Sequence, residues 1–210
     1  MSAAIYLPVS LGEAIDKLTI LDIKLARISD FRAVDIKKEY DLLYDALKPF
    51  VEQYGSLYTS MKKVNTLIWE FMDDLRDGEL EGDAYLTLCK KTIDFNDIRF
   101  RIKNKINSAS GSFLKEQKGY KVNSVLITGE ISDVDHIVMP IRYYSYLYDQ
   151  VIIHSNNDQL KARFQEDPAI VFVDTIEHTY KHVVTLSNQQ SKEDILNIFN
   201  VDEKTMAMLL

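Results

Sequence analysis

The spacing of hydrophobic residues changes near residue 120. Before it, apolar residues recur every three or four positions, which is the period of an amphipathic helix. After it, short β-branched runs at 125–127, 151–153 and 170–173 alternate with segments of helical pattern, as buried parallel strands do. The pattern predicts an α+β protein with a helical bundle over residues 1–118 and a small α/β module over residues 119–210.

Four helices are expected in the bundle, joined by short connections that make neighbours antiparallel. The first begins at Ser10, where Glu13 three residues later forms a capping-box pattern. Pro49 is expected to kink or divide the second helix, and Gly78 is placed as the C-terminal cap of the third. The first helix has apolar residues on nearly every side, so we expect the α/β module or a second copy to pack on it. The first expected helix begins at Ser10, and the second spans about residues 35–54. The third follows Gly55 and runs to Asp77, and the fourth spans about residues 83–108.

The second half has the β-α-β-α-β order of a small Rossmann-like module with a mainly parallel sheet. Its first helix is expected to be capped by Ser132 or Asp133. The apolar residues at 206–210 suit docking on a partner. The expected strands cover 122–128, 150–154, 170–174 and 183–186, and the expected helices cover about 132–148, 160–164 and 191–199.

Ligands of such sheets bind beyond the carboxyl ends of the strands. The loop after the first strand has one glycine where the dinucleotide fingerprint needs three, and Glu130 and Asp133 would repel a pyrophosphate. This edge therefore has no ordinary phosphate loop. The candidate ligand residues there are Thr128, Gly129, Glu130, His154, Ser155, Asn156, Asp174 and Thr175.

The charge argues against a nucleic-acid-binding protein, and the cysteine content excludes an intramolecular disulfide. The net charge is −7, and the residues after 118 contribute 7 Lys and Arg against 13 Asp and Glu. An acidic module is a poor partner for a nucleic-acid backbone, which is bound by clustered Lys and Arg. Cys89 is the single cysteine, so no intramolecular disulfide can form. With no signal-peptide pattern and no run of about 18 apolar residues, we expect a cytoplasmic protein without a membrane span.

Ionisable residues lie tightly among large apolar ones in the bundle. Two carboxylate pairs, Glu13 with Asp16 and Glu70 with Asp73, each lie three residues apart on one helix face. Facing pairs of this kind could hold Mg²⁺ or Mn²⁺, and the spacing resembles that of the all-α nucleotide pyrophosphohydrolases. The alternative is a face of mutually paired charges. The polar cluster comprises Glu13, Asp16, Lys17, Lys24, Glu70, Asp73, Asp74, Arg76, Asp97 and Arg99.

Three ordered segments, at 8–24, 67–76 and 96–107, resemble a family known only as a domain of unknown function. The resemblance covers about residues 5–120. It places the family's characteristic positions on most of the polar cluster and on Trp69 and Asn96. Members tend to occur with glycosyltransferases and surface-polysaccharide functions, which implies a link to glycan metabolism.

Residues 133–174 are similar to the first Rossmann-like half of heptosyltransferase-like glycosyltransferases. The chain ends at Leu210 without a second half, so we expect an accessory or binding module linked to glycan or nucleotide-sugar metabolism. One alternative is a metal-dependent hydrolase or transferase that uses the helical carboxylates. Another is a non-catalytic scaffold, as a homo-oligomer or on a partner protein.

Overall fold

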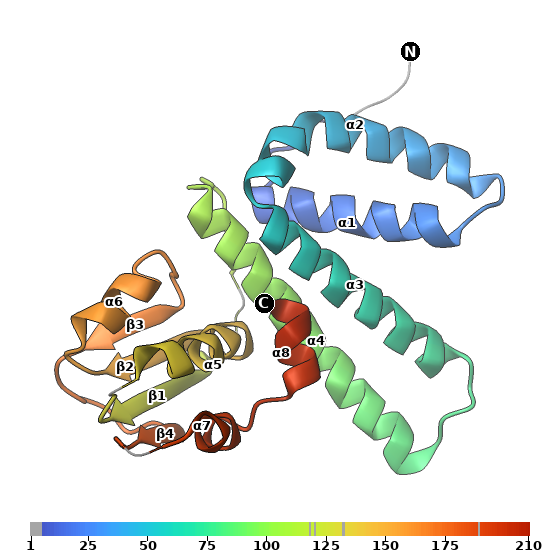
Figure 1. The fold of residues 1–210 in the computed structure, drawn as a ribbon. Helices are drawn as coiled ribbons and strands as arrows, with labels where there is room; N and C mark the ends of the chain where they lie inside the picture. Colours follow the sequence, from blue (N-terminus) through green and yellow to red (C-terminus); the bar gives the residue numbers. More distant parts are fainter. Residues whose placement is uncertain (1–5, 118, 120, 132, 189) are drawn as a thin grey trace. The chain divides into compact units, whose positions relative to one another are not determined.

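The computed structural model of the chain describes residues 6–117, 119, 121–131, 133–188 and 190–210. The chain divides into two compact units, Met1–Gln117 and Lys118–Leu210 (Figure 1). The first is helical, and the second is a small parallel sheet with helices. The α+β class predicted from the sequence is confirmed. We describe each unit by itself.

The helical unit contains the four expected helices. Figure 1 shows α1 and α2 side by side as one antiparallel pair and α3 and α4 as a second pair. Each helix lies within a few residues of its predicted position. Their bounds are α1 Leu11–Arg27, α2 Arg32–Gln53, α3 Gly55–Arg76 and α4 Gly82–Ala109.

Local sequence signals set most of the helix ends. Ser10 caps α1 by accepting a hydrogen bond from the Glu13 backbone N–H at 3.2 Å, and Gly78 follows α3 with a φ of 76°. Pro49 does not divide α2, which continues through it to Gln53. Pro49 lies about one turn from the end of the helix. Its missing N–H removes one helical hydrogen bond.

Helix α1 is the centre of its unit, in contact with α2, α3 and α4. Its buried residues therefore occupy several faces; Ile15, Leu18 and Ile23 are each at most 3% exposed. Three helices of the same unit cover the broad apolar surface that suggested an outside partner. Packing of the α/β unit or of a second copy on α1 is not required to explain this burial and stays a prediction.

The α/β unit contains four parallel strands in the order β3-β2-β1-β4. Asp133 caps the first helix by accepting bonds from the N–H groups of Asp135 and His136; the alternative cap, Ser132, lies outside the described residues. The strands are β1 Ser124–Gly129, β2 Gln150–His154, β3 Ile170–Val173 and β4 His182–Leu186, and the helices are α5 Val134–Leu147, α6 Asp158–Phe164, α7 Lys192–Ile198 and α8 Glu203–Leu209.

Helix α8 was not predicted from the sequence. It contacts α5 of the same unit, and Leu209 at its end is only 1% exposed. Docking of residues 206–210 on a partner stays a prediction.

Successive strand residues point to opposite faces of the sheet, and the two faces differ in burial. On one face, Val125 and Ile127 of β1 are at most 1% exposed. The other face carries a row of paired residues, one from each strand. The residues on the two central strands, Leu126 and Ile152, are buried, whereas those on the edge strands, Val171 and Val183, are exposed. Since β3 and β4 lie at opposite edges, the connection at 174–181 must cross the sheet, and it begins at the carboxyl edge.

Candidate functional site

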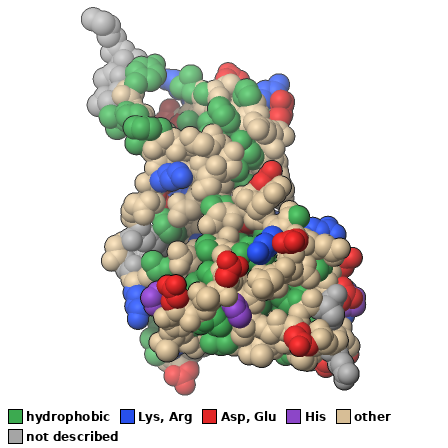
Figure 2. All heavy atoms as spheres, turned by 90° about the vertical axis from the view of Figure 1, so that its left-hand side faces the viewer, with side chains coloured by type: hydrophobic (Ala, Val, Ile, Leu, Met, Phe, Trp, Pro, Cys, Tyr) green, Lys and Arg blue, Asp and Glu red, His purple; other side chains and the backbone are tan. Residues whose placement is uncertain are grey.

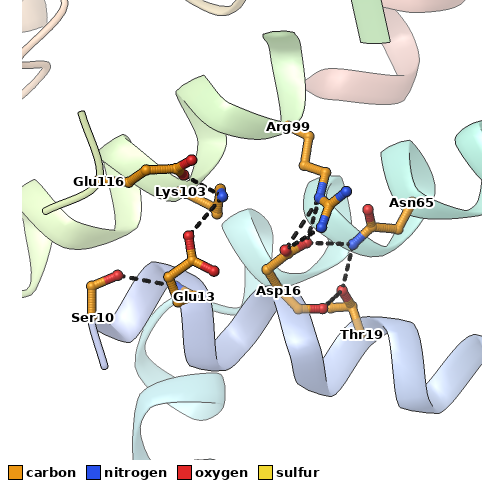
Figure 3. Close-up of polar contacts among 8 residues, drawn as sticks. All are labelled: Ser10, Glu13, Asp16, Thr19, Asn65, Arg99, Lys103 and Glu116. Carbon is orange, nitrogen blue, oxygen red and sulfur yellow. Dashed lines mark hydrogen bonds and ion pairs between the residues drawn. The ribbon is translucent and has the colours of Figure 1, made fainter. Parts of the chain in front are cut away.

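The polar cluster of the helical unit is centred on Asp16, which is only 3% exposed. Its carboxylate binds Arg99 of α4 through Nη2 at 2.6 Å and Nε at 2.9 and 3.1 Å. Asn65 of α3 donates from Nδ2 to Asp16 Oδ1 at 2.8 Å and to Thr19 Oγ1 at 2.9 Å. One carboxylate thus joins three helices (Figure 3).

A second ion pair lies beside the first (Figure 3). Lys103 of α4, 7% exposed, reaches the Glu13 carboxylate at 2.7 Å and also pairs with Glu116. The Glu13 side chain thus binds α4, while its backbone N–H donates to the Ser10 cap of α1. Burial opposes the charged form of Lys103, but its bonds to Glu116 and Glu13 outweigh that effect and raise its pKa. The pKa of Arg99 is raised in the same way: burial opposes the charge, and the bond to Asp16 outweighs it.

The first turn of α1 lies directly on α4. The Gly12 N–H donates to Asn107 Oδ1 at 2.7 Å, and an added Cβ on Gly12 would lie 2.5 Å from the Lys103 carbonyl oxygen. The Leu11 N–H donates to Ser112 Oγ at 3.3 Å. Only glycine allows this approach, and it brings Glu13 and Asp16 within reach of the cations on α4.

The remaining cluster residues lie toward the surface. Lys17 pairs with Glu39 of α2 at 2.6 Å. Arg27 pairs with Glu70 at 2.8 Å and approaches Asp73 at 4.0 Å, with its guanidinium 5.8 Å from the centre of the half-buried Trp69 ring. These residues do not join the Asp16 network. Asp74, Arg76 and Asn96 are exposed, and Lys24 and Asp97 are half-buried.

The structure does not bring the four expected metal ligands together. Glu13 and Asp16 bind cations of α4, whereas Glu70 and Asp73 face Arg27. Among the described residues, no group of three or more His, Cys, Asp or Glu side chains is placed to hold a metal ion. The reason is that Lys and Arg from other helices already neutralise the carboxylates. The hydrolase alternative, which needs these carboxylates as ligands, stays a prediction.

The predicted carboxyl edge of the sheet carries a pocket of about 300 Å³. It lies where β1 and β2 end side by side, because Thr128 and His154 are register partners. The order of these parallel strands puts both loops at one edge. The pocket is lined by Thr128, Gly129, His154, Ser155 and Asn156.

His154 is held from both sides. Its Nε2 lies 3.2 Å from the Asp174 carbonyl oxygen, and its Nδ1 lies 3.2 Å from Thr128 Oγ1. A carbonyl oxygen can only accept, so Nε2 carries the hydrogen and donates it. In the neutral ring Nδ1 then accepts from the Thr128 hydroxyl. The lone pairs of that hydroxyl stay available to a ligand that donates.

At the carboxyl ends of β1 and β4, backbone hydrogen bonds close the space between the two strands. The strands stay paired to Gly129 and Leu186, the Glu130 N–H donates to the Leu186 carbonyl at 3.1 Å, and Glu130 binds Asn188. Gly129 has a φ of 112°, and an added Cβ would lie 2.0 Å from the Leu186 oxygen. Strand packing therefore requires this glycine, whether or not a ligand binds.

Among the residues that the structure describes, no Lys or Arg lines the pocket. The face of the molecule in Figure 2 mixes Asp and Glu with Lys, Arg and His, and its described residues form no continuous basic patch there. Of the sequence candidates, Thr128, Gly129, His154, Ser155 and Asn156 meet at the pocket. Asp174 contributes its carbonyl to His154, Glu130 turns to Asn188, and Thr175 is exposed in the crossing connection.

Four residues of the helical network lie outside the polar cluster defined from the sequence: Thr19, Asn65, Lys103 and Glu116. Asn65 carried a signal, because it follows Val64 on the apolar stripe of α3, where a polar side chain is buried only with a partner. Glu116 lies beyond the end of α4, and no pattern in the sequence pointed to it.

Comparison with known proteins gives one match. The model of a family of unknown function (DUF6165) matches residues 5–133. The match includes the whole Asp16 network, β1 and the loop with Thr128 and Gly129, and it ends before His154. No curated protein and no solved structure matches the chain. Among the described residues, no helix is long and apolar enough to cross a membrane. With most of its length matched, the chain belongs to the family of unknown function DUF6165.

Proposed function

We propose that the protein is an accessory or binding protein of glycan or nucleotide-sugar metabolism, and that the pocket between β1 and β2 binds the sugar part of its ligand. The observation that carries the proposal is the composition of the pocket. Thr128, Ser155 and Asn156, three of its lining residues, carry two hydroxyls and an amide. These groups both donate and accept hydrogen bonds, as a ligand rich in hydroxyls requires.

Size and charge narrow the ligand class. A volume of about 300 Å³ is at the lower limit for small-molecule sites, which suits one sugar ring better than a whole nucleotide sugar. The described residues of the lining include no cation for a phosphate, and the residues after 118 carry net negative charge. A neutral sugar is therefore favoured over a free nucleotide.

Two further points favour this function. The resemblance of residues 133–174 to the first half of heptosyltransferase-like glycosyltransferases, suggested by the sequence, is part of this proposal. The sheet has the β3-β2-β1-β4 order of parallel Rossmann-like sheets. A single cysteine suits a reducing compartment, and we place the protein in the cytoplasm on that ground.

The test is saturation-transfer NMR on the full chain with three probes: a neutral hexose, UDP-glucose and UDP. We expect transfer to the hexose ring protons, whether the sugar is free or linked to UDP, and no competition by UDP alone. Asn156→Ala should weaken hexose binding by up to roughly tenfold, the loss of one neutral hydrogen bond.

The matched control is Asn197→Ala, an exposed asparagine of α7 outside the pocket, which should bind as the wild type does. Binding of UDP alone at the strength of UDP-glucose, or identical affinities for Asn156→Ala and the wild type, would refute the proposal.

A further inference from the structure

The face of α2 that points away from α1 exposes several apolar residues among charged ones. The inward face of the helix, with Tyr40, Leu43 and Val51, packs against Ala14 and Leu18 of α1. The opposite face begins with Phe31 just before the helix, 85% exposed, and continues with Leu42, 70% exposed. Val34 at one edge is 72% exposed, and Ala46 and Pro49 are exposed as well.

Two charges flank Leu42 on this outward face. Lys38 lies one turn before it and Asp45 one turn after it, on the same side of the helix. Within the described residues, neither makes an ion pair, whereas the neighbouring Lys37 and Asp41 pair with each other at 2.7 Å. Seven residues of helix separate Lys38 and Asp45 by about 10 Å along the axis. Lys38 and Asp45 can therefore form ion pairs with charged groups outside α2.

We propose that α2 pairs antiparallel with α2 of a second copy of the chain. A two-fold axis midway between Lys38 and Asp45 puts each lysine opposite the aspartate of the other copy, and both pairs form on the same side of the contact. The same axis puts Val34 opposite Pro49 and brings the two Leu42 side chains together at the centre. A two-fold contact must be self-complementary in this way.

The size of the contact predicts a weak dimer. The 22 residues of α2 make a helix of about 33 Å. One pair of such helices buries less than the roughly 800 Å² per partner of a standard stable interface. Monomer and dimer should therefore exchange, and the dimer fraction should rise with protein concentration.

Sedimentation equilibrium of the full chain over a range of concentrations tests this dimer. We expect the mass to rise from 24.3 kDa toward twice that value. Leu42→Glu should keep the chain at the monomer mass, because it places two carboxylates together on the axis. The control is Ile93→Glu on α4, where the native side chain is 62% exposed; it should dimerise as the wild type does.

A charge exchange tests the predicted register. Lys38→Glu and Asp45→Lys should each raise the dissociation constant by at least roughly threefold, since each puts like charges opposite one another. The double variant Lys38→Glu/Asp45→Lys should recover the wild-type constant. Because both side chains are exposed, unchanged circular dichroism should accompany each variant.

Three outcomes would overturn the dimer. The mass could stay at 24.3 kDa at every concentration, as it would if another part of the same chain or a different protein occupied this face. Leu42→Glu could dimerise like the wild type, which would put the contact elsewhere. The double charge variant could fail to recover, which would exclude the antiparallel register.

Discussion

Asp16 and Arg99 form a bidentate ion pair that joins α1 to α4 across 83 residues of sequence. Asp16 is almost fully buried, and the Arg99 side chain is 26% exposed. A buried carboxylate needs such a partner, because its loss of hydration costs several kcal/mol. The charges that stand out in the helical sequence therefore hold the helices together, and the candidate ligand site lies in the other unit.

Removing the Asp16 charge should destabilise the helical unit strongly. Asp16→Asn leaves the Arg99 guanidinium without its counter-ion and should lower the free energy of unfolding by about 3 kcal/mol, measured by urea denaturation. Lys17→Ala is the control on the adjacent residue. The Lys17–Glu39 pair is about half exposed, so its loss should cost less than about 1 kcal/mol. Equal losses in the two variants would contradict the structural role of Asp16.

Gly12 of α1 and Gly55 of α3 should respond oppositely to alanine. In Gly12→Ala the new methyl group would lie 2.5 Å from the Lys103 carbonyl oxygen, and the displacement of α1 from α4 should cost about 1–3 kcal/mol. At Gly55, a Cβ meets nothing within 4 Å, so Gly55→Ala should be neutral or stabilising by up to about 1 kcal/mol. Thermal unfolding of both variants measures the difference. A stable Gly12→Ala protein would mean that α1 does not approach α4 so closely.

Tyr146 should make the α/β unit sensitive to alkali. Burial, aided by the nearby Asp167 charge, raises the pKa of its phenol to about 12, above the unfolded value of about 10. The folded state therefore holds the proton longer than the unfolded state. The resulting stability is complete below pH ~10 and is lost as the pH rises through the folded pKa.

This contribution is at most roughly 3 kcal/mol, from the difference between the two pKa values. Urea unfolding across the alkaline range should show a shallower loss of stability in Tyr146→Phe than in the wild type. Tyr6→Phe, where the native ring is 92% exposed, should leave the profile unchanged. A Tyr146→Phe profile that falls as steeply as the wild type would show that the phenol titrates normally in the folded protein.

Local signals in the sequence predicted the elements and the sheet edge well. Period and capping placed the four long helices, and the β-branched runs placed β2 at its observed bounds. Because parallel strands end at one edge, Thr128 and His154 could be brought together from their positions alone, and they are register partners. Helix α8 was missed, although Asp202 carries a capping signal through its bonds to the N–H groups of Lys204 and Thr205.

Long-range partners could not be predicted in the same way. Spacing along one helix suggests contacts three or four residues away, so Glu13 and Asp16 looked like one metal-binding pair. The structure instead pairs Glu13 with Lys103 and Asp16 with Arg99. That choice depends on the rotation of α1 against α4, which is set by the close approach at Gly12 and is not written in local spacing.

The central claim is that the β1–β2 edge binds a sugar and that the helical charges are structural. Amide chemical-shift mapping of the isotopically labelled full chain during a hexose titration tests it most directly. We predict saturable shifts at Gly129, Ser155 and Asn156 and unchanged resonances at Asp16, Asn65 and Arg99. Shifts centred on the Asp16 network, or no shift at the sheet edge at saturating hexose, would contradict the account.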